Sequence, residues 1–203
     1  MARGALVHDA ARDYIVGKLN KMPAELVRFE SEFKKLRLIY KKRTVGIMVE
    51  EDWAGTKDWD RTTWNDWVNC YVRIKLDCAH YESPEVLIVR DWKTGKYRQE
   101  LHDDYLEQLE LYSLAALIFH PHLKEVRPEL VYLDIGVTYP PSDKPLVYTQ
   151  ADVKRLKAVW AKRVKPMMNG TIVSPKQTDK SQGCSYGAAG KAKGGPGVCK
   201  FWP

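Results

Sequence analysis

Two aspartates and a lysine are spaced so that they could share one catalytic site. Asp91 and Lys93 lie two residues apart in an extended segment, so their side chains point to the same face. Asp77 precedes Asp91 by 14 residues, with a turn signal around Pro84 between them. An antiparallel hairpin centred on Pro84 would place Asp77 directly opposite Asp91, with both carboxylates on one face.

Two carboxylates at that distance repel each other and stay ionised together only when a cation lies between them. Hard oxygen ligands favour Mg²⁺ or Mn²⁺, and such an ion can activate water against a phosphate. A nearby lysine could hold that water or the developing anion. The spacing alone is also compatible with a surface ion pair on an amphipathic hairpin, worth under about 1 kcal/mol.

Further residues around the hairpin follow a recognisable order. The segment VRIKLD (72–77) precedes LIVRDWKTGK (87–96), QLELY (108–112) follows them, and RGALVH (3–8) lies upstream. Together these motifs resemble the PD-(D/E)XK nuclease superfamily, and most of all its RecB-type nuclease domain, as found in phage and bacterial exonucleases. The resemblance covers roughly residues 3 to 120 and implies a mixed α/β restriction-endonuclease-like fold, with a central sheet flanked by helices.

The resemblance also implies a role for each matching residue. The metal, Mg²⁺ or Mn²⁺, would be held by His8, Asp77, Asp91 and the carbonyl of Trp92. Lys93 would position or activate the attacking water. Gln108 and Tyr112, at i and i+4 on one helix face, would support the site and contact the nucleic-acid strand. An additional acid falls at Glu50 or Glu51, with Glu50 preferred; Gln108 and Tyr112 could equally be an exposed residue and a core aromatic.

The elements that must position these residues alternate between helical and extended periods. Helices are expected at 3–19, 23–41, 103–119 and 150–166, and strands at 45–49, 71–79, 85–92, 130–138 and 146–148. On the first helix, Leu6, Ala10, Tyr14 and Leu19 lie roughly on one face. This order indicates a mixed α/β domain with one central sheet.

Charge and composition divide the chain into a nuclease-like domain at 1–167 and a basic, glycine-rich tail at 168–203. The net charge is +7, but residues 151–203 carry eleven Lys or Arg and two Asp, a net +9, which leaves −2 for residues 1–150. A basic segment beside a mildly acidic body predicts a polyanionic partner, here DNA. A solvated lysine-rich surface is the alternative.

Cysteine usage and the N-terminus indicate a reducing compartment. The chain has no apolar leader and no apolar run long enough for a membrane span, so a cytoplasmic protein, bacterial or in a phage-infected cell, is expected. Some relatives bind an iron–sulfur cluster through one early and three clustered late cysteines. The cysteines here, at 70, 78, 184 and 199, do not fit that spacing, so no cluster is predicted.

Other candidates have plainer explanations. His120 and His122 could form a metal pair but have no third ligand at helical spacing. His80 and His102 are expected in turns or facing solvent, with a place near the site as the alternative for either. The tryptophans at 53, 59, 64 and 67 could stack on unpaired bases or fill a core under a long loop, and the core is preferred.

The sequence therefore predicts a metal-dependent DNA nuclease, an exonuclease by resemblance, that acts in recombination, repair or degradation of DNA, with a further protein partner in a recombination complex. The alternative is a non-catalytic nucleic-acid-binding module, or a subunit that needs a partner for activity. A third class, a small-molecule or protein-interaction domain, would fail to bind DNA at low salt.

Overall fold

The computed structural model describes residues 3–43 and 46–168. Residue contacts divide the chain into one unit from Met1 to Ala158 and a second that begins at Val159, and each is described by itself. The first unit holds every strand and all the predicted site residues. The predicted tail at 168–203 lies outside the described residues except for its first residue, so the domain boundary at 167 stays a prediction.

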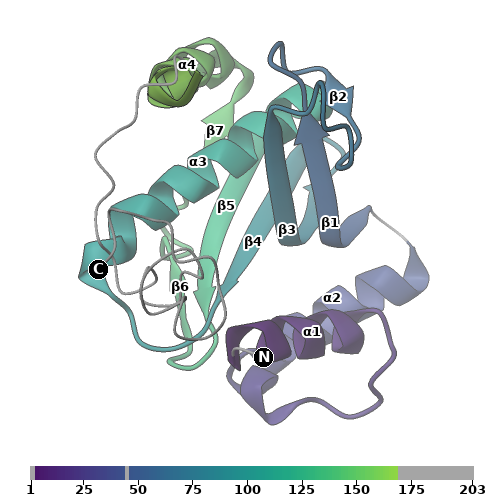
Figure 1. The fold of residues 1–203 in the computed structure, drawn as a ribbon. Coiled ribbons are helices and arrows are strands. Elements are labelled where there is room, and N and C mark those ends of the chain that lie inside the picture. Colours follow the sequence, from purple (N-terminus) through teal and green to yellow (C-terminus); the bar gives the residue numbers. More distant parts are fainter. Residues whose placement is uncertain (1–2, 44–45, 169–203) are drawn as a thin grey trace, which may run out of the picture. The chain divides into compact units, whose positions relative to one another are not determined.

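A seven-stranded sheet forms the centre of the first unit (Figure 1). Its strands are β1 (Ile47–Gly55), β2 (Arg61–Thr62), β3 (Val72–Ser83), β4 (Val86–Lys93), β5 (Glu125–Tyr132), β6 (Val137–Tyr139) and β7 (Tyr148–Thr149). The order is β2-β1-β3-β4-β5-β6, and β7 also pairs with β5. Only β4 and β5 run parallel; the other pairs are antiparallel. The mixed sheet predicted from the sequence is confirmed.

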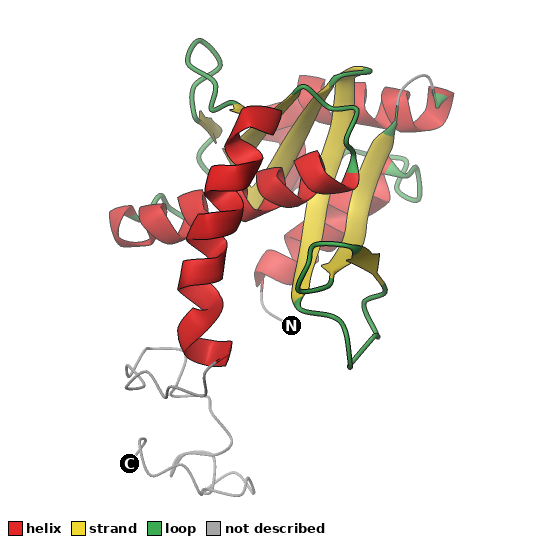
Figure 2. Ribbon diagram, turned by 90° about the horizontal axis from the view of Figure 1, so that it is seen from above, coloured by secondary structure: helices red, strands yellow, loops and turns green. Residues whose placement is uncertain are grey.

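Helices flank the strands on both sides, as Figure 2 shows. The helical elements are α1 (Arg3–Ile15), η1 (Ala24–Phe29), α2 (Glu30–Lys42), η2 (Gln99–Leu101), α3 (His102–Phe119), η3 (Gln150–Asp152) and α4 (Val153–Met168). Buried Trp92 of β4 and Val131 of β5 pack against α1, η1 and α2. Leu130 and Tyr132, which flank Val131 along β5, pack against Leu109 of α3 instead. Alternate residues of β4 and β5 therefore face different helices.

The α3 helix connects the two parallel strands, because a parallel pair needs a crossover that returns the chain to the same end of the sheet. Asp103 and Asp104 lie in its first turn, where carboxylates offset the positive end of the helix dipole. Figure 1 shows α3 running across β4 and β5. This crossing brings the side chains of α3 over the carboxyl end of β4.

The buried face of α1 differs from the predicted one by one position. Val7, Ala11, Tyr14 and Ile15 are buried, whereas Leu6 is 53% exposed. Residues 7, 11, 14 and 15 also follow helical spacing, and they bury more apolar surface against α2 and the sheet. His8 is next to this face and is half-buried.

Two segments begin elsewhere than the sequence indicates. The strand predicted at 130–138 begins at Glu125, because its charged residues are paired rather than solvated: Arg127 binds Glu82 and Glu125, and Glu129 binds Arg90. The helix predicted at 23–41 begins as a 3₁₀ turn and becomes α-helical at Glu30. None of the helices in the described residues has the length and apolar character that a membrane span requires.

Candidate active site

From Tyr81 to Cys78 the β3–β4 hairpin has the register that the sequence predicts, whereas next to the turn the register shifts by one residue between Tyr81 and Ser83. Its Cα partners include Cys78 with Arg90 and His80 with Ile88. Continued by one residue, this register sets Asp77 opposite Asp91, as a hairpin centred on Pro84 requires. The ladder between the strands ends at the Cys78–Arg90 pair, and from there β3 pairs only with β1 and β4 only with β5.

Asp77 lies where the two strands part and uses both carboxylate oxygens. Its Oδ2 accepts a hydrogen bond from the backbone N–H of Trp92 at 2.7 Å, which replaces a ladder bond between the strands. Its Oδ1 lies 3.0 Å from Nδ1 of His8 on α1. This hydrogen bond is the main cause that raises the pKa of His8, against a lowering by burial. The carboxylate therefore links three elements, β3, β4 and α1.

The Trp92 backbone faces the same gap. In a strand, the N–H and C=O of one residue point to the same side, so the Trp92 carbonyl also points toward β3 rather than β5. The carbonyl of the next residue, Lys93, points the other way and accepts the N–H of Leu133 at 2.9 Å. The Trp92 indole is buried in the core against α2, with its ring centroid 5.1 Å from that of Phe33. The backbone direction fits the ligand role implied by the resemblance.

Glu50 completes a group of potential metal ligands with His8 and Asp77. One ligand atom from each of the three lies within 4.8 Å of the others. Glu50 is the residue of β1 opposite Asp77, and its φ of 52° falls in the left-handed region, which is strained for a residue other than glycine. Its Oε2 lies 3.3 Å from Nζ of Lys75, whereas its buried Oε1 has no hydrogen-bond partner.

That unpaired oxygen makes the group suited to a cation. A buried carboxylate oxygen without a donor is costly, and a divalent ion among two carboxylates and one imidazole would satisfy it. Glu51, the other candidate for the additional acid, points elsewhere and accepts a hydrogen bond from Nε1 of Trp53 at 3.0 Å.

Asp91 is beside this group rather than in it. Its Oδ2 lies 2.5 Å from Nζ of Lys93, an ion pair between largely buried side chains. Burial raises the pKa of Asp91 to about 6, with a further rise from the charge of Asp77 and an opposing effect of Lys93. Asp91 thus holds the lysine close to the ligand group, and the negative charge of Asp77 raises its pKa.

Lys93 begins a chain of hydrogen bonds that runs onto α3. Its Nζ donates to Oε1 of Gln108 at 3.0 Å, Gln108 donates to the hydroxyl of Tyr112, and this hydroxyl donates to the carbonyl of Lys75 at 3.2 Å. Gln108 and Tyr112 come together at i and i+4, as predicted. The chain connects β4 to β3 through α3 and fixes where the lysine ammonium lies.

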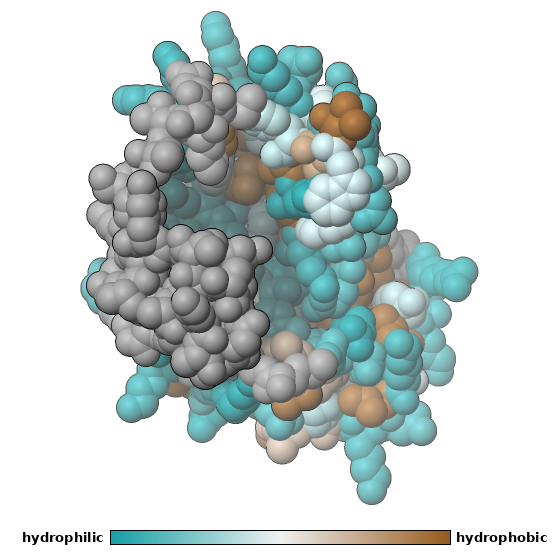
Figure 3. Space-filling view, in the orientation of Figure 1, coloured by the Kyte–Doolittle hydropathy of each residue, from teal (hydrophilic) through white to brown (hydrophobic). Residues whose placement is uncertain are grey.

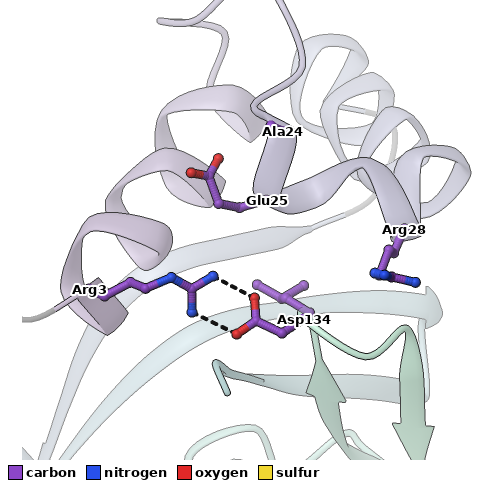
Figure 4. A pocket seen from close by; sticks show the side chains of 6 residues that line it. Arg3, Ala24, Glu25, Arg28 and Asp134 are labelled. Atoms are coloured by element: carbon purple, nitrogen blue, oxygen red, sulfur yellow. Dashed lines mark hydrogen bonds and ion pairs between the residues drawn. The ribbon is translucent and has the colours of Figure 1, made fainter. Parts of the chain in front are cut away.

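A second fixed point is Asp134, in the turn after β5. Its carboxylate forms a two-pronged ion pair with Arg3 of α1, at 2.6 and 2.7 Å (Figure 4). The same carboxylate also accepts a hydrogen bond from the N–H of Gly95. Arg3 and the Gly95 N–H lower the pKa of Asp134 to about 2. Gly95 has a φ of 89°, so the turn that follows Lys93 needs a glycine. Asp134 thereby ties the start of the His8 helix to the end of β4.

The remaining sequence candidates lie away from this group. His120 and His122 are near Tyr81, whose hydroxyl is 3.1 Å from Nδ1 of His120. The expectation that His80 faces solvent is wrong: His80 is 1% exposed, and burial lowers its pKa to about 3. Of the four tryptophans, Trp53 is buried as the core assignment predicts, whereas Trp67 is 78% exposed.

Sequence reasoning missed three residues that shape the site. Tyr105 places its ring 4.1 Å from Nζ of Lys93. Its spacing with Gln108 and Tyr112, i, i+3 and i+7, is a helical-face pattern that could have revealed it. Lys75 lies within the VRIKLD motif (72–77) but had no role assigned there, and Asp134 lies far from the motifs in sequence, so only the folded chain shows that both reach the site.

Comparisons with known proteins agree with the geometry at the level of the family. No curated protein gives a match. A solved structure titled "Crystal structure of SSO0001" aligns over 98% of both chains with 13% identity and a TM-score of 0.33, too low to carry an argument. A family model described as the PD-(D/E)XK nuclease superfamily matches residues 1–189. Since that match covers most of the chain and both carboxylate-bearing strands, the protein belongs to the PD-(D/E)XK nuclease superfamily.

Proposed function

We propose that the protein is a Mg²⁺- or Mn²⁺-dependent deoxyribonuclease that hydrolyses phosphodiester bonds from DNA ends. The observation that carries this proposal is the group of His8, Glu50 and Asp77 around a buried, unpaired carboxylate oxygen, next to the Asp91–Lys93 ion pair. Membership of the nuclease superfamily supports the reaction class.

The ligand group has the donors that such an ion takes. His8, Glu50 and Asp77 would hold it, with the Trp92 carbonyl facing the same gap. A bound divalent ion supplies Lewis-acid polarisation of the scissile phosphate and makes the attacking water more acidic. The orientation of Asp77 is set before any ion binds, because its Oδ2 is already held by the Trp92 N–H.

Lys93 is the residue of this chain that acts on the reacting atoms. Its ammonium is fixed from two sides by Asp91 and Gln108, so its remaining N–H can hold the attacking water or the phosphate oxygen on which negative charge grows. Water adds to phosphorus and loses a proton to solvent, the bond from phosphorus to the leaving oxygen breaks, and that oxygen takes up a proton from solvent. The ammonium stabilises the extra negative charge between these events. Tyr105 covers the lysine and limits the access of other water to it.

The exonuclease mode, the RecB-type relationship and a role in recombination, repair or phage DNA metabolism in the cytoplasm rest on the sequence motifs. DNA as partner is further supported by charge. The α4 helix is strongly basic, with Lys or Arg at 154, 155, 157, 162, 163 and 165. Such a helix would neutralise phosphates and make binding sensitive to salt.

A gel assay on linear and circular DNA, single- and double-stranded, tests this function. The wild-type protein should degrade linear substrates in Mg²⁺ or Mn²⁺, leave closed circles uncut and stop when a chelator is added. Asp91→Asn should lose cleavage but retain the wild-type circular dichroism spectrum. Cut circles would show endonuclease mode instead. If the protein binds DNA in a salt-sensitive way but gives no metal-dependent products with any of these substrates, the catalytic function is contradicted. The protein would then be a non-catalytic nucleic-acid-binding module.

A further inference from the structure

The loop between β2 and β3 presents large apolar side chains to solvent. Trp67 is 78% exposed and Val68 is 90% exposed, and Tyr71 at the end of the loop is 37% exposed. We call these three residues the Trp67 patch. Figure 3 shows brown and nearly white residues at the surface around β2 and its flanking loops, among hydrophilic neighbours. Clustered exposure of this kind marks a binding surface rather than a misplaced core.

The loop that carries the patch is held in one conformation by Asp66. Its carboxylate accepts hydrogen bonds from the Thr62 hydroxyl at 2.6 Å, the Asn69 N–H at 3.0 Å and the Val68 N–H at 3.3 Å. Trp67, between these anchor points, therefore has a fixed place. A fixed aromatic ring loses little conformational entropy when a ligand packs against it.

Arg73 of β3 joins the patch to the sheet. Its guanidinium lies 4.4 Å from the ring centroid of Trp67, a cation–π contact, and its Nε donates to the Trp64 carbonyl at 2.9 Å. Arg73 is exposed, so the group that orients Trp67 also presents positive charge to solvent.

A second exposed cation, Lys75, lies between Arg73 and the candidate active site. Lys75 is two residues further along β3, on the same face of the strand, and is also exposed. Its Nζ lies 3.3 Å from Oε2 of Glu50, a member of the metal-ligand group. From Arg73 to Asp77 the strand rises only about 13 Å. An aromatic ring, an arginine and a lysine thus follow β3 up to the carboxylates.

Two cations in a row beside an exposed aromatic ring suit a single strand of nucleic acid, since phosphates pair with the cations and an unpaired base stacks on the ring. The internal bases of a blunt duplex are stacked on both faces, so only its terminal base pair exposes a face, whereas every unpaired base of a single strand can stack on Trp67. We propose that Trp67, Arg73 and Lys75 form a track for unpaired DNA, so that the substrate class is single-stranded DNA or a DNA end with an unpaired strand. This inference rests on the proposed function and specifies its substrate.

Binding measured in the absence of cleavage tests the track. In a Lys93→Ala background with chelator, fluorescence anisotropy at low salt compares a labelled single strand with a blunt duplex of the same sequence. The background protein should prefer the single strand. Adding Trp67→Ala should weaken single-strand binding by about tenfold, within the range for loss of one stacked base, and leave duplex binding unchanged. Trp67→Phe, which keeps an aromatic ring, should restore most of the affinity.

Tyr40→Ala is the matched control, because Tyr40 is an exposed aromatic residue on α2 and lies outside the track. It should bind both substrates like the background protein. Photo-crosslinking with bromodeoxyuridine in the single strand should recover Trp67 in the crosslinked peptide. Equal single-strand affinities of the background protein and Trp67→Ala would overturn the proposal, as would crosslinks that map only to other segments.

Kinetics with the wild-type chain separate a failure of the track from a failure of the nuclease function. If DNA is cleaved and Trp67→Ala has the wild-type KM for single strands, the track is wrong and the nuclease function stands. If no variant cleaves but single-strand binding depends on Trp67, the track stands and the catalytic function fails. Both are supported when Trp67→Ala raises KM by about tenfold with little change in kcat.

Discussion

Glu50 shows how a single residue can be costly for the fold and useful to the site. It is in the middle of β1 with a left-handed backbone conformation, and one buried oxygen of its carboxylate lacks a hydrogen-bond partner among the described residues. Both features cost free energy in the isolated chain. A bound cation would offset the second cost, which ties the stability of the protein to the metal.

Metal should therefore raise the melting temperature through Glu50. An ion present at about a hundred times its Kd stabilises the folded state by about 2.7 kcal/mol, which for a chain of this size is a shift of roughly 5–10 °C. Glu50→Gln should show a much smaller shift in a thermal scan with Mn²⁺ against chelator. Glu51→Gln, one residue away and bonded to Trp53 instead, is the matched control and should keep the full shift. The wild-type shift in Glu50→Gln would remove Glu50 from the ligand group.

At the scale of elements, the site depends on how α1 is fixed to the end of β4. His8 reaches Asp77 only because α1 packs through its buried face and is anchored at Arg3 by Asp134. The pocket of about 280 Å³ beside this ion pair, lined also by Glu25 and Arg28, leaves the anchor without tight packing on that side (Figure 4). The Arg3 side chain is 59% exposed, so solvent screens this ion pair and its contribution lies in the range of surface pairs.

Asp134→Ala should loosen α1 without touching the reacting groups. We expect a loss of about 1 kcal/mol in the free energy of unfolding, together with weaker metal binding measured by titration calorimetry. Arg3→Ala should have a smaller effect, because Asp134 still accepts the Gly95 N–H. The pKa of Asp134 is lowered, so this stabilisation is present above about pH 4 and is lost as the pH falls toward 2. Metal affinity equal to wild type in Asp134→Ala would show that the anchor does not position His8.

The sequence predicts elements best where local signals and tertiary contacts agree. The register of the β3–β4 hairpin from Tyr81 to Cys78 is the one expected for a turn at Pro84, but the irregularity between Tyr81 and Ser83 is not predictable from the residue types there. The beginning of β5 is not, since Arg127 and Glu129 resemble solvated residues until their partners on other strands are known. Likewise, the position of Glu50 depends on a left-handed backbone conformation in β1 that its residue type does not predict.

At the scale of the whole molecule, the core contains a buried histidine whose neutral form is compatible with the fold and whose protonation in acid is destabilising. His80 is almost fully buried, with its Nδ1 3.5 Å from Arg90, and Arg90 is paired with Glu32 and Glu129. Protonation of His80 would put a second positive charge beside the arginine. Burial followed by the charge of Arg90 accounts for its low pKa, about 3.

The protein should therefore lose stability in acid through His80. His80 takes up a proton near pH 6.5 in the unfolded chain but only near pH 3 in the folded chain. The free energy of unfolding is therefore unaffected by this group above pH 6.5 and falls as the pH decreases from 6.5 to 3. By pH 4.5 the loss is on the order of 2–3 kcal/mol. Urea unfolding of His80→Gln between pH 7 and 4.5 should show a flatter pH dependence than wild type. Parallel pH profiles would contradict the buried, neutral imidazole.

The proposed catalysis depends most on Lys93, the group that acts on the phosphate. The direct measurement is the initial rate of cleavage of end-labelled linear DNA in Mn²⁺, compared among wild type, Lys93→Ala and Lys34→Ala, whose lysine is exposed on α2 and pairs with Glu30. We predict chelator-sensitive cleavage by wild type, an equal rate for Lys34→Ala and a rate lower by at least about a hundredfold for Lys93→Ala. Cleavage by Lys93→Ala at the wild-type rate would contradict the proposed active site.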